Sequence, residues 1–116
     1  MSKKRIIKSL TGLGLERNEV QAYLFLAIQG PHKLKKIAVA LNQTIDSIII
    51  SLNELQNLGI VRSSVDDPGI YIALPFGEVI DLFIDLKKEQ AKTMQESREE
   101  LLSSWRETIK KEIIKK

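Results

Sequence analysis

The hydrophobic positions between residues 44 and 61 recur at steps of three and four, the spacing that places side chains on one face of an α-helix. These positions are Ile45, Ile48, Ile49, Leu52, Leu55 and Leu58. Thr44 precedes them and can cap the helix, because its hydroxyl accepts a hydrogen bond from a free backbone N–H of the first turn. Gly59 follows them and supplies the left-handed residue that often ends a helix. The pattern therefore predicts one amphipathic helix from Thr44 to Leu58.

Three shorter helical patterns precede this helix, over residues 3–13, Arg17–Gln29 and Lys33–Leu41. Their predicted inward residues are Ile6, Ile7 and Leu10 in the first, Val20, Tyr23, Leu24, Ala27 and Ile28 in the second, and Leu34, Ile37, Ala38 and Leu41 in the third. Only the pair Asn42-Gln43 separates the third helix from the helix at Thr44. Two helices joined by so short a turn are typical of a helix-turn-helix.

A β-hairpin is predicted directly after Gly59. Ile60–Val65 begins with β-branched residues, which favour a strand, and Ile70–Leu74 is expected to return beside it. The intervening Asp66-Asp67-Pro68-Gly69 is a strong turn signal, because proline fixes φ and glycine tolerates positive φ. A hairpin that follows a helix-turn-helix indicates a winged helix-turn-helix, in which the helix from Thr44 is the recognition helix.

The segment from Glu78 to the C-terminus contains no proline or glycine and predicts one long helix. Such a helix is not stabilised by its own propensity alone, so its distal apolar residues need a partner. We expect a coiled-coil-like pairing of two chains, because a two-fold dimer is the simplest closed assembly. The residues expected at this dimer contact are Leu86, Met94, Leu101, Trp105, Ile109 and Ile113. Trp105 could instead stack on a ligand, but its place in a step-of-four pattern favours packing.

Together these patterns predict a mainly α chain with a small β-hairpin wing. Residues 1–77 would form the winged helix-turn-helix domain, and residues 78–116 the dimerisation helix. The hydrophobic share of 43% is sufficient for one small core.

The formal net charge of +3 conceals a strong segregation along the chain. Residues 1–36 carry a net charge of +6, residues 37–86 a net charge of −6, and residues 87–116 a net charge of +3. The predicted recognition helix and wing therefore lie in the acidic part, while the basic residues lie toward the two ends.

The composition excludes several kinds of chemistry. Cysteine is absent and His32 is the single histidine, so neither a disulfide framework nor a usual zinc ligand set is available. No catalytic pair of acids and no glycine-rich phosphate loop is evident, so we expect no enzyme activity, cofactor or metal. No apolar run of about 18 residues exists to span a membrane, and the basic N-terminus lacks the features of a signal peptide. We therefore expect a cytoplasmic protein.

Four segments, at residues 10–30, 33–42, 47–61 and 71–83, resemble the DNA-binding domain of the TrmB family of archaeal transcriptional regulators. The resemblance covers about residues 10–85 and implies a winged-helix, dimeric regulator of transcription. Ile49 stands where the family pattern has tyrosine, and the wing lacks the basic loop of many members. Because the chain stops after the long helix, the sugar-binding region of full-length members is expected to be missing, and no sugar effector is predicted.

In this fold the outer face of the recognition helix approaches the major groove of duplex DNA. The residues assigned to that face are Gln43, Thr44, Asp46, Ser47, Ile50, Ser51 and Glu54. Gln43 could pair with adenine, and Asp46 could accept a hydrogen bond from cytosine N4. However, no Lys or Arg lies between Gln43 and Leu58.

Phosphate neutralisation requires cations, so we expect them to come from elements around the recognition helix. The candidates are Lys33, Lys35 and Lys36 before the turn, Arg62 in the wing, and Lys3, Lys4, Arg5 and Lys8 in a basic N-terminal arm.

Several alternatives remain open from the residues alone. The acidic middle of the chain also suits a winged-helix module that binds a basic protein partner and no DNA. His32 could contact a phosphate or could simply begin the third helix without a special role. The terminal lysines, including Lys115 and Lys116, could bind DNA or an anionic surface, or could form the frayed, solvated end of a helix.

Overall fold

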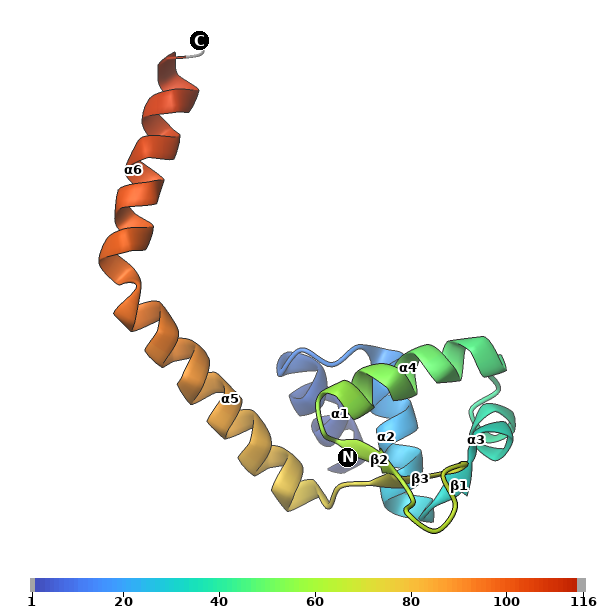
Figure 1. Cartoon of the computed structure of the whole chain (residues 1–116). Helices are drawn as coiled ribbons and strands as arrows, with labels where there is room; N and C mark the ends of the chain where they lie inside the picture. Colours follow the sequence, from blue (N-terminus) through green and yellow to red (C-terminus); the bar gives the residue numbers. More distant parts are fainter. Residues whose placement is uncertain (1, 115–116) are drawn as a thin grey trace. The chain divides into compact units, whose positions relative to one another are not determined.

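The computed structural model describes residues 2–114, with side chains for residues 3–113. Figure 1 shows the succession of helices and strands. They are α1 (Ser2–Gly12), α2 (Arg17–Gln29), β1 (His32–Lys33), α3 (Leu34–Ala40), α4 (Ile45–Asn57), β2 (Val61–Ser63), β3 (Ile70–Ala73), α5 (Phe76–Glu96) and α6 (Arg98–Ile114). The predicted fold class, a mainly α winged helix-turn-helix with a small β-hairpin wing, is confirmed. The chain divides into two compact units, Met1–Ile80 and Asp81–Lys116.

The two ends of α4 have the caps that the sequence predicts. The Thr44 hydroxyl accepts a hydrogen bond from the Ser47 backbone N–H at 3.1 Å. At the other end Gly59 has a φ of 82°, where a residue with a Cβ is strained. The Ile60 N–H then donates to the Leu55 carbonyl at 2.9 Å, so a free carbonyl of the last helical turn is satisfied.

The turn between α3 and α4 depends on Asn42, which has a φ of 52°. Asparagine tolerates this left-handed conformation better than most residues. The turn closes because the Gln43 N–H donates to the Ala38 carbonyl at 3.0 Å. This turn directs α4 away from α3 and completes the predicted helix-turn-helix.

The wing is part of a three-stranded antiparallel sheet with the order β1-β3-β2. The sequence predicts the β2–β3 hairpin but not β1, where His32 pairs with Tyr71 and Lys33 with Ile70. Two residues are too few to show an alternating pattern, and only the pairing with β3 makes them a strand. The prediction that Lys33 begins the third helix is therefore wrong by one residue, since α3 begins at Leu34.

The core of the first unit lies around α2, against which α1, α4 and β3 pack. The fully buried residues include Leu10, Val20, Tyr23, Leu26, Ile37, Ile48, Leu52, Leu55, Ile60 and Val79. Ala27 and Ile28 were predicted to face inward, but both are exposed, Ile28 by 62%. Three elements pack on α2. Its buried face therefore includes Ala22 and Leu26, which the sequence analysis did not select.

Tyr23 joins α2 to the segment that leaves the wing. Its side chain is fully buried, and its O–H donates to the Leu74 carbonyl at 2.8 Å. Burial raises the pKa of Tyr23 from 10.0 to about 12, because the charged phenolate would lose its solvation.

This pKa shift predicts that stability falls at alkaline pH. The unfolded chain releases the Tyr23 proton near pH 10.0, whereas the folded chain keeps it until about pH 12. The stabilisation is therefore complete below pH 10 and is lost as the pH rises toward 12. Urea denaturation gives the free energy of unfolding of the native protein and of Tyr23→Phe. The difference between these two free energies should narrow by roughly 1 kcal/mol between pH 9 and pH 11. A difference that stays constant would show that Tyr23 does not titrate differently in the two states.

The C-terminal segment differs from the single long helix that the sequence predicts. It forms two helices, α5 and α6, interrupted at Ser97. The Ser97 N–H still bonds the Thr93 carbonyl at 3.0 Å, so the interruption is local. Serine is a weaker helix former than its charged neighbours, and residues 87–96 are all exposed, so no packing keeps this stretch regular. The predictions for Lys115 and Lys116 lie outside the described residues.

Candidate nucleic-acid interface

The exposed face of α4 contains most of the residues predicted to lie on it. Thr44, Asp46, Ile50 and Glu54 are exposed. Ser51 is the exception, since it is only 4% exposed and the prediction that it faces outward is wrong. Its position is explained by spacing, because a residue three after the buried Ile48 returns to the same side of a helix.

Two polar residues at the start of α4 bond to other side chains of the protein. The Gln43 side-chain amide donates to the side-chain oxygen of Gln21 on α2 at 3.1 Å. The Ser47 hydroxyl donates to the Gln43 side-chain oxygen at 3.0 Å. Gln43 and Ser47 are therefore half-buried, and their hydrogen bonds connect α4 to α2.

The outward face includes residues that the sequence analysis did not select. Asn53 and Asn57 are exposed and share a stripe with Asp46 and Ile50, at steps of three and four. Centring the buried face on Ile48, Leu52 and Leu55 would have identified this stripe from the sequence. Ile45 and Ile49 were predicted to face inward, but they are 41% and 37% exposed because they lie at the edge of the buried face.

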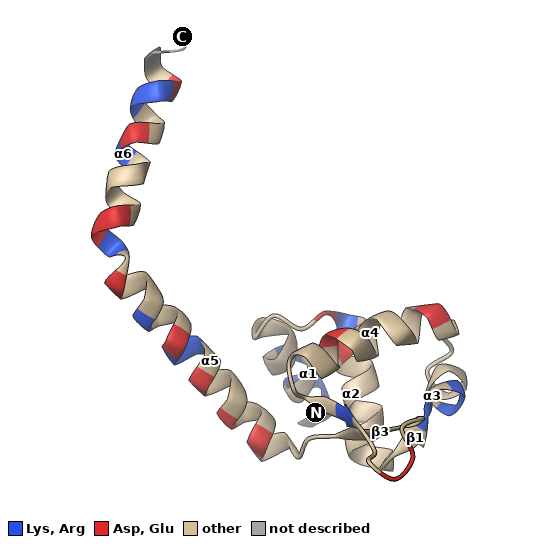
Figure 2. Cartoon of the chain, in the orientation of Figure 1, with Lys and Arg blue, Asp and Glu red and all other residues tan. Residues whose placement is uncertain are grey.

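The lysines at the start of α3 form the main cationic group beside the turn. Lys33, Lys35 and Lys36 are all exposed, as predicted. Figure 2 shows blue segments, the colour of Lys and Arg, on α3, and the tip of the wing in red, the colour of Asp and Glu. Among the described residues the ion pairs join Lys33 to Asp67 and Arg98 to Glu99. Lys35 and Lys36 therefore have no ion-pair partner within the described part of the chain.

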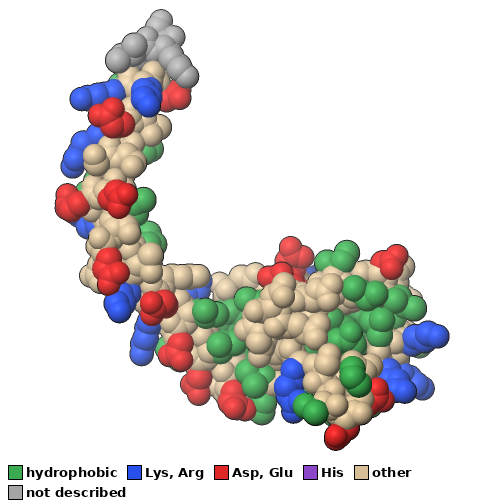
Figure 3. Space-filling view, viewed as in Figure 1, with side chains coloured by type: hydrophobic (Ala, Val, Ile, Leu, Met, Phe, Trp, Pro, Cys, Tyr) green, Lys and Arg blue, Asp and Glu red, His purple; other side chains and the backbone are tan. Residues whose placement is uncertain are grey.

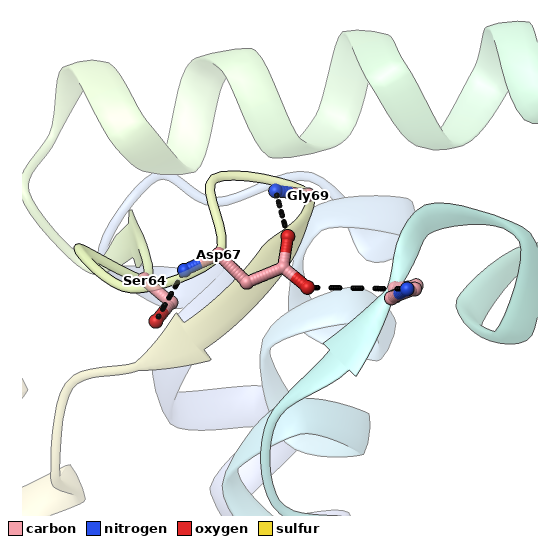
Figure 4. A network of polar contacts seen from close by, with 4 residues as sticks. Ser64, Asp67 and Gly69 are labelled. Carbon is pink, nitrogen blue, oxygen red and sulfur yellow. Dashed lines mark hydrogen bonds and ion pairs between the residues drawn. The ribbon is translucent and has the colours of Figure 1, made fainter.

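The tip of the wing is organised around Asp67, as Figure 4 shows. One oxygen of its carboxylate accepts a hydrogen bond from the Gly69 N–H at 3.1 Å, and the other lies 3.9 Å from the Lys33 ammonium. The Asp67 N–H donates to the Ser64 hydroxyl at 3.4 Å. The carboxylate thus holds the turn, and its charge is partly balanced by Lys33, although so exposed a pair contributes little to stability.

The remaining predicted cations lie on other elements. Arg62 is exposed on β2. Lys3, Lys4 and Arg5 are exposed on α1, so the predicted basic arm is helical. Of these, Lys3 lines a groove between α1, α2 and α3 that also includes Leu41.

His32 has a structural environment that neither sequence interpretation described. It belongs to β1 rather than to the start of a helix. Its Nδ1 lies 2.7 Å from the Gly30 carbonyl, and its ring lies 4.8 Å from the Phe25 ring between centroids. Within the described residues no cluster of three His, Cys, Asp or Glu side chains could hold a metal ion. In the same part of the chain, no helix has both the length and the apolar character needed to cross a membrane.

Several known structures share this fold. The archaeal chromatin protein TrmBL2, whose structure shows a novel mode of DNA binding, matches with a TM-score of 0.78 and 21% identity. The match covers 90% of this chain and 40% of TrmBL2, so the chain spans less than half the length of that protein.

Two further structures match less closely. The transcriptional regulator PA4135 has a TM-score of 0.52 and 23% identity, over 100% of this chain and 88% of its own. The MarR family transcription regulator SP03579 has a TM-score of 0.53 and 18% identity, over 91% and 74%. At these identities the three structures establish the winged-helix fold. A comparison with curated proteins finds no match.

A family model identifies the chain more specifically. Residues 10–77 match the model for the sugar-specific transcriptional regulator TrmB. The matched segment is more than half of the chain and extends from the end of α1, through the helix-turn-helix and the wing, into the first turn of α5. It contains most of the positions by which the sequence resembles this family. The chain therefore belongs to the TrmB family of transcriptional regulators.

Proposed function

We propose that this protein is a homodimeric transcriptional regulator that binds duplex DNA in a sequence-dependent manner, with α4 in the major groove. The observation that carries the proposal is the position of Lys35 and Lys36. Both are exposed, neither has an ion-pair partner in the described part of the chain, and both lie on the helix before the turn. In helix-turn-helix proteins this helix crosses the DNA backbone, where lysines neutralise phosphates.

The division of charge between α3 and α4 supports this docking. α4 contains no Lys or Arg, and its exposed acids are Asp46 and Glu54. These acids would disfavour a phosphate but can accept hydrogen bonds from exocyclic amino groups of bases. Affinity would therefore come from α3, with Arg62 and the cations of α1 as further contributors, and discrimination would come from α4.

The printed description of TrmBL2 is consistent with this proposal. That protein binds DNA and has the same fold over 90% of this chain. Family membership adds a role in transcription. For this chain, both properties are part of the proposal.

The homodimer is proposed from the exposed residues of α5 and α6. Leu101, Trp105, Ile109 and Ile113 recur at steps of four along α6, and we refer to them as the distal stripe. Their exposed fractions are 52%, 61%, 37% and 66%, whereas a stripe of this kind is normally covered. Leu86 and Met94 on α5 are exposed by 37% and 66% and would extend the contact. A two-fold dimer would present two copies of α4 to two half-sites.

The test is the salt dependence of binding to a fluorescent mixed-sequence duplex. We expect the native protein to bind more weakly as salt rises, because phosphate contacts release counterions. The variant Lys35→Ala/Lys36→Ala should bind every sequence more weakly. The slope of log K against log salt is negative, and its magnitude should decrease by about 2. The matched control is Lys87→Ala/Lys88→Ala, which removes the same charge from exposed positions on α5 and should leave the slope unchanged.

Two results would contradict the docking. Equal binding by the α3 variant and the native protein would remove α3 from the interface. Absence of binding at low salt would reject DNA as the ligand and favour the second candidate, a module that binds a basic protein through its acidic surface. The observation that favours this candidate is the exposure of Asp46 and Glu54 on an α4 without cations.

A further inference from the structure

The hydrogen bonds of α4 limit the polar side chains that could read a DNA base. Ser51 is 4% exposed and faces the core. The amide of Gln43 already bonds both Gln21 and Ser47. These bonds use one of the two amide N–H groups of Gln43 and the hydroxyl hydrogen of Ser47, so the amide cannot turn toward a base without losing them. A base contact that requires such a turn would add little net free energy. Of the polar residues expected at the DNA, Gln43, Ser47 and Ser51 are therefore held within the protein, whereas Asp46 is exposed.

The same helix exposes an unusual amount of apolar surface. Ile50 is 70% exposed, and Ile45 and Ile49 are 41% and 37% exposed. Val39, near the end of α3, is 81% exposed. Figure 3 shows hydrophobic side chains gathered over α3 and α4, next to blue lysine side chains. Gathered apolar surface of this kind on a soluble domain indicates a binding surface.

The surroundings of this apolar surface favour a nucleic acid as its ligand. Val39 and Ile45 line one hollow together with Lys35, which has no ion-pair partner in the described part of the chain. An apolar hollow bordered by a lysine complements a DNA groove, in which the base edges lie between two rows of phosphates. Ile50 lies outside this hollow, on the outward face of α4 that helix-turn-helix proteins direct into the major groove. In the major groove the apolar group on the base edges is the C5-methyl group of thymine.

We propose that α4 recognises the C5-methyl groups of thymines in the major groove, and that Ile50 makes the principal contact. This inference rests on the proposed DNA binding and specifies the chemistry that α4 reads. Ile50 is β-branched and has few rotamers in a helix, so it presents a rigid apolar surface. Asp46 lies one turn before Ile50 and can accept a hydrogen bond from an exocyclic amino group, which the adenine of an A·T pair supplies in the same groove.

The test compares two duplexes that differ only in methyl groups. One is A·T-rich, and the other has deoxyuridine in place of every thymidine, so base pairing is unchanged. We expect the native protein to bind the thymine duplex more tightly, by about fourfold for each methyl group contacted. Affinities for a G·C-rich duplex with and without 5-methylcytosine show whether the same methyl group is recognised on a different base. Tighter binding to the methylated form would support recognition of the methyl group itself.

The variant Ile50→Ala distinguishes direct contact from a change in DNA shape. It should abolish the difference between thymine and uracil duplexes while retaining salt-dependent binding. The matched control is Ile28→Ala on α2. Ile28 is also an exposed isoleucine, at 62%, and its replacement should preserve the difference in affinity between the thymine and uracil duplexes. Because both side chains are exposed, both variants are expected to fold.

The outcomes separate this inference from the proposed function. Salt-dependent binding with equal affinity for thymine and uracil duplexes would overturn methyl recognition and leave DNA binding intact. A thymine preference that persists in Ile50→Ala would overturn the role of Ile50. Failure to bind any duplex would reject the proposed function itself. If Ile50→Ala changes only self-association, the apolar surface serves a second copy of the chain, and the inference is wrong.

Discussion

Replacing Leu101 and Trp105 together by alanine is expected to convert the protein from a dimer to a monomer. Both side chains are more than half exposed within one chain, at 52% and 61%, and both belong to the distal stripe. Large apolar and aromatic side chains dominate the energetics of such contacts. Sedimentation velocity at micromolar concentration should show one dimeric species for the native protein and one monomeric species for the variant.

A control and an internal reporter strengthen this experiment. Ser103→Ala/Ser104→Ala changes exposed positions on α6 outside the distal stripe and should leave the dimer intact. Trp105 is the single tryptophan of the chain, so its fluorescence reports on this contact alone. Dilution of the native protein should shift the emission to longer wavelengths as the dimer dissociates and the indole meets water. A monomeric native protein, or an emission spectrum independent of concentration, would refute the proposed dimer.

Loss of the dimer should also weaken DNA binding. A dimer that contacts two half-sites gains affinity because the second contact is intramolecular once the first has formed. We expect the monomeric variant to bind a duplex at least about tenfold more weakly than the native dimer. Unchanged affinity would indicate that one winged helix is sufficient for binding.

Leu52→Ala is expected to cause a large loss of stability. Leu52 is 1% exposed and faces the core, together with Ile48 and Leu55. Removing a buried leucine side chain costs about 2–5 kcal/mol, because apolar burial is lost and a cavity remains. For a domain of this size we expect the melting temperature to fall by about 10–20 °C. Thermal unfolding followed by circular dichroism, at one fixed protein concentration, measures this change.

Ile50→Ala is the natural control for Leu52→Ala, because it lies on the same helix and is 70% exposed. We expect it to change stability by less than about 0.5 kcal/mol, the range typical of surface positions. A large destabilisation by Ile50→Ala would contradict the orientation of α4 and would weaken the interpretation of its DNA-binding phenotype. Similar melting temperatures for Leu52→Ala and the native protein would place Leu52 outside the core.

The amino-acid sequence alone was sufficient to predict the local features of the fold. The limits of α4 follow from Thr44 and Gly59, because a hydroxyl cap and a positive-φ glycine are requirements of the backbone itself. Asp66-Asp67-Pro68-Gly69 does form the predicted wing turn, but Gly69 does not take the positive φ that the prediction assumed. The Asp67 carboxylate closes the turn by accepting a hydrogen bond from the Gly69 N–H. The exposure of Lys33, Lys35 and Lys36 follows from the high cost of burying an unpaired charge.

Other features were decided by the tertiary structure, because they depend on residues far apart in the chain. β1 exists because β3 pairs with it, and two residues carry no pattern of their own. The Gln43 side chain is hydrogen-bonded within the protein because the fold brings Gln21, on α2, within reach of it. Ser51 is 4% exposed and Ile28 is 62% exposed, the opposite of what their polar and apolar characters predict. Periodicity gives the direction of a helical face, but only packing determines its edges.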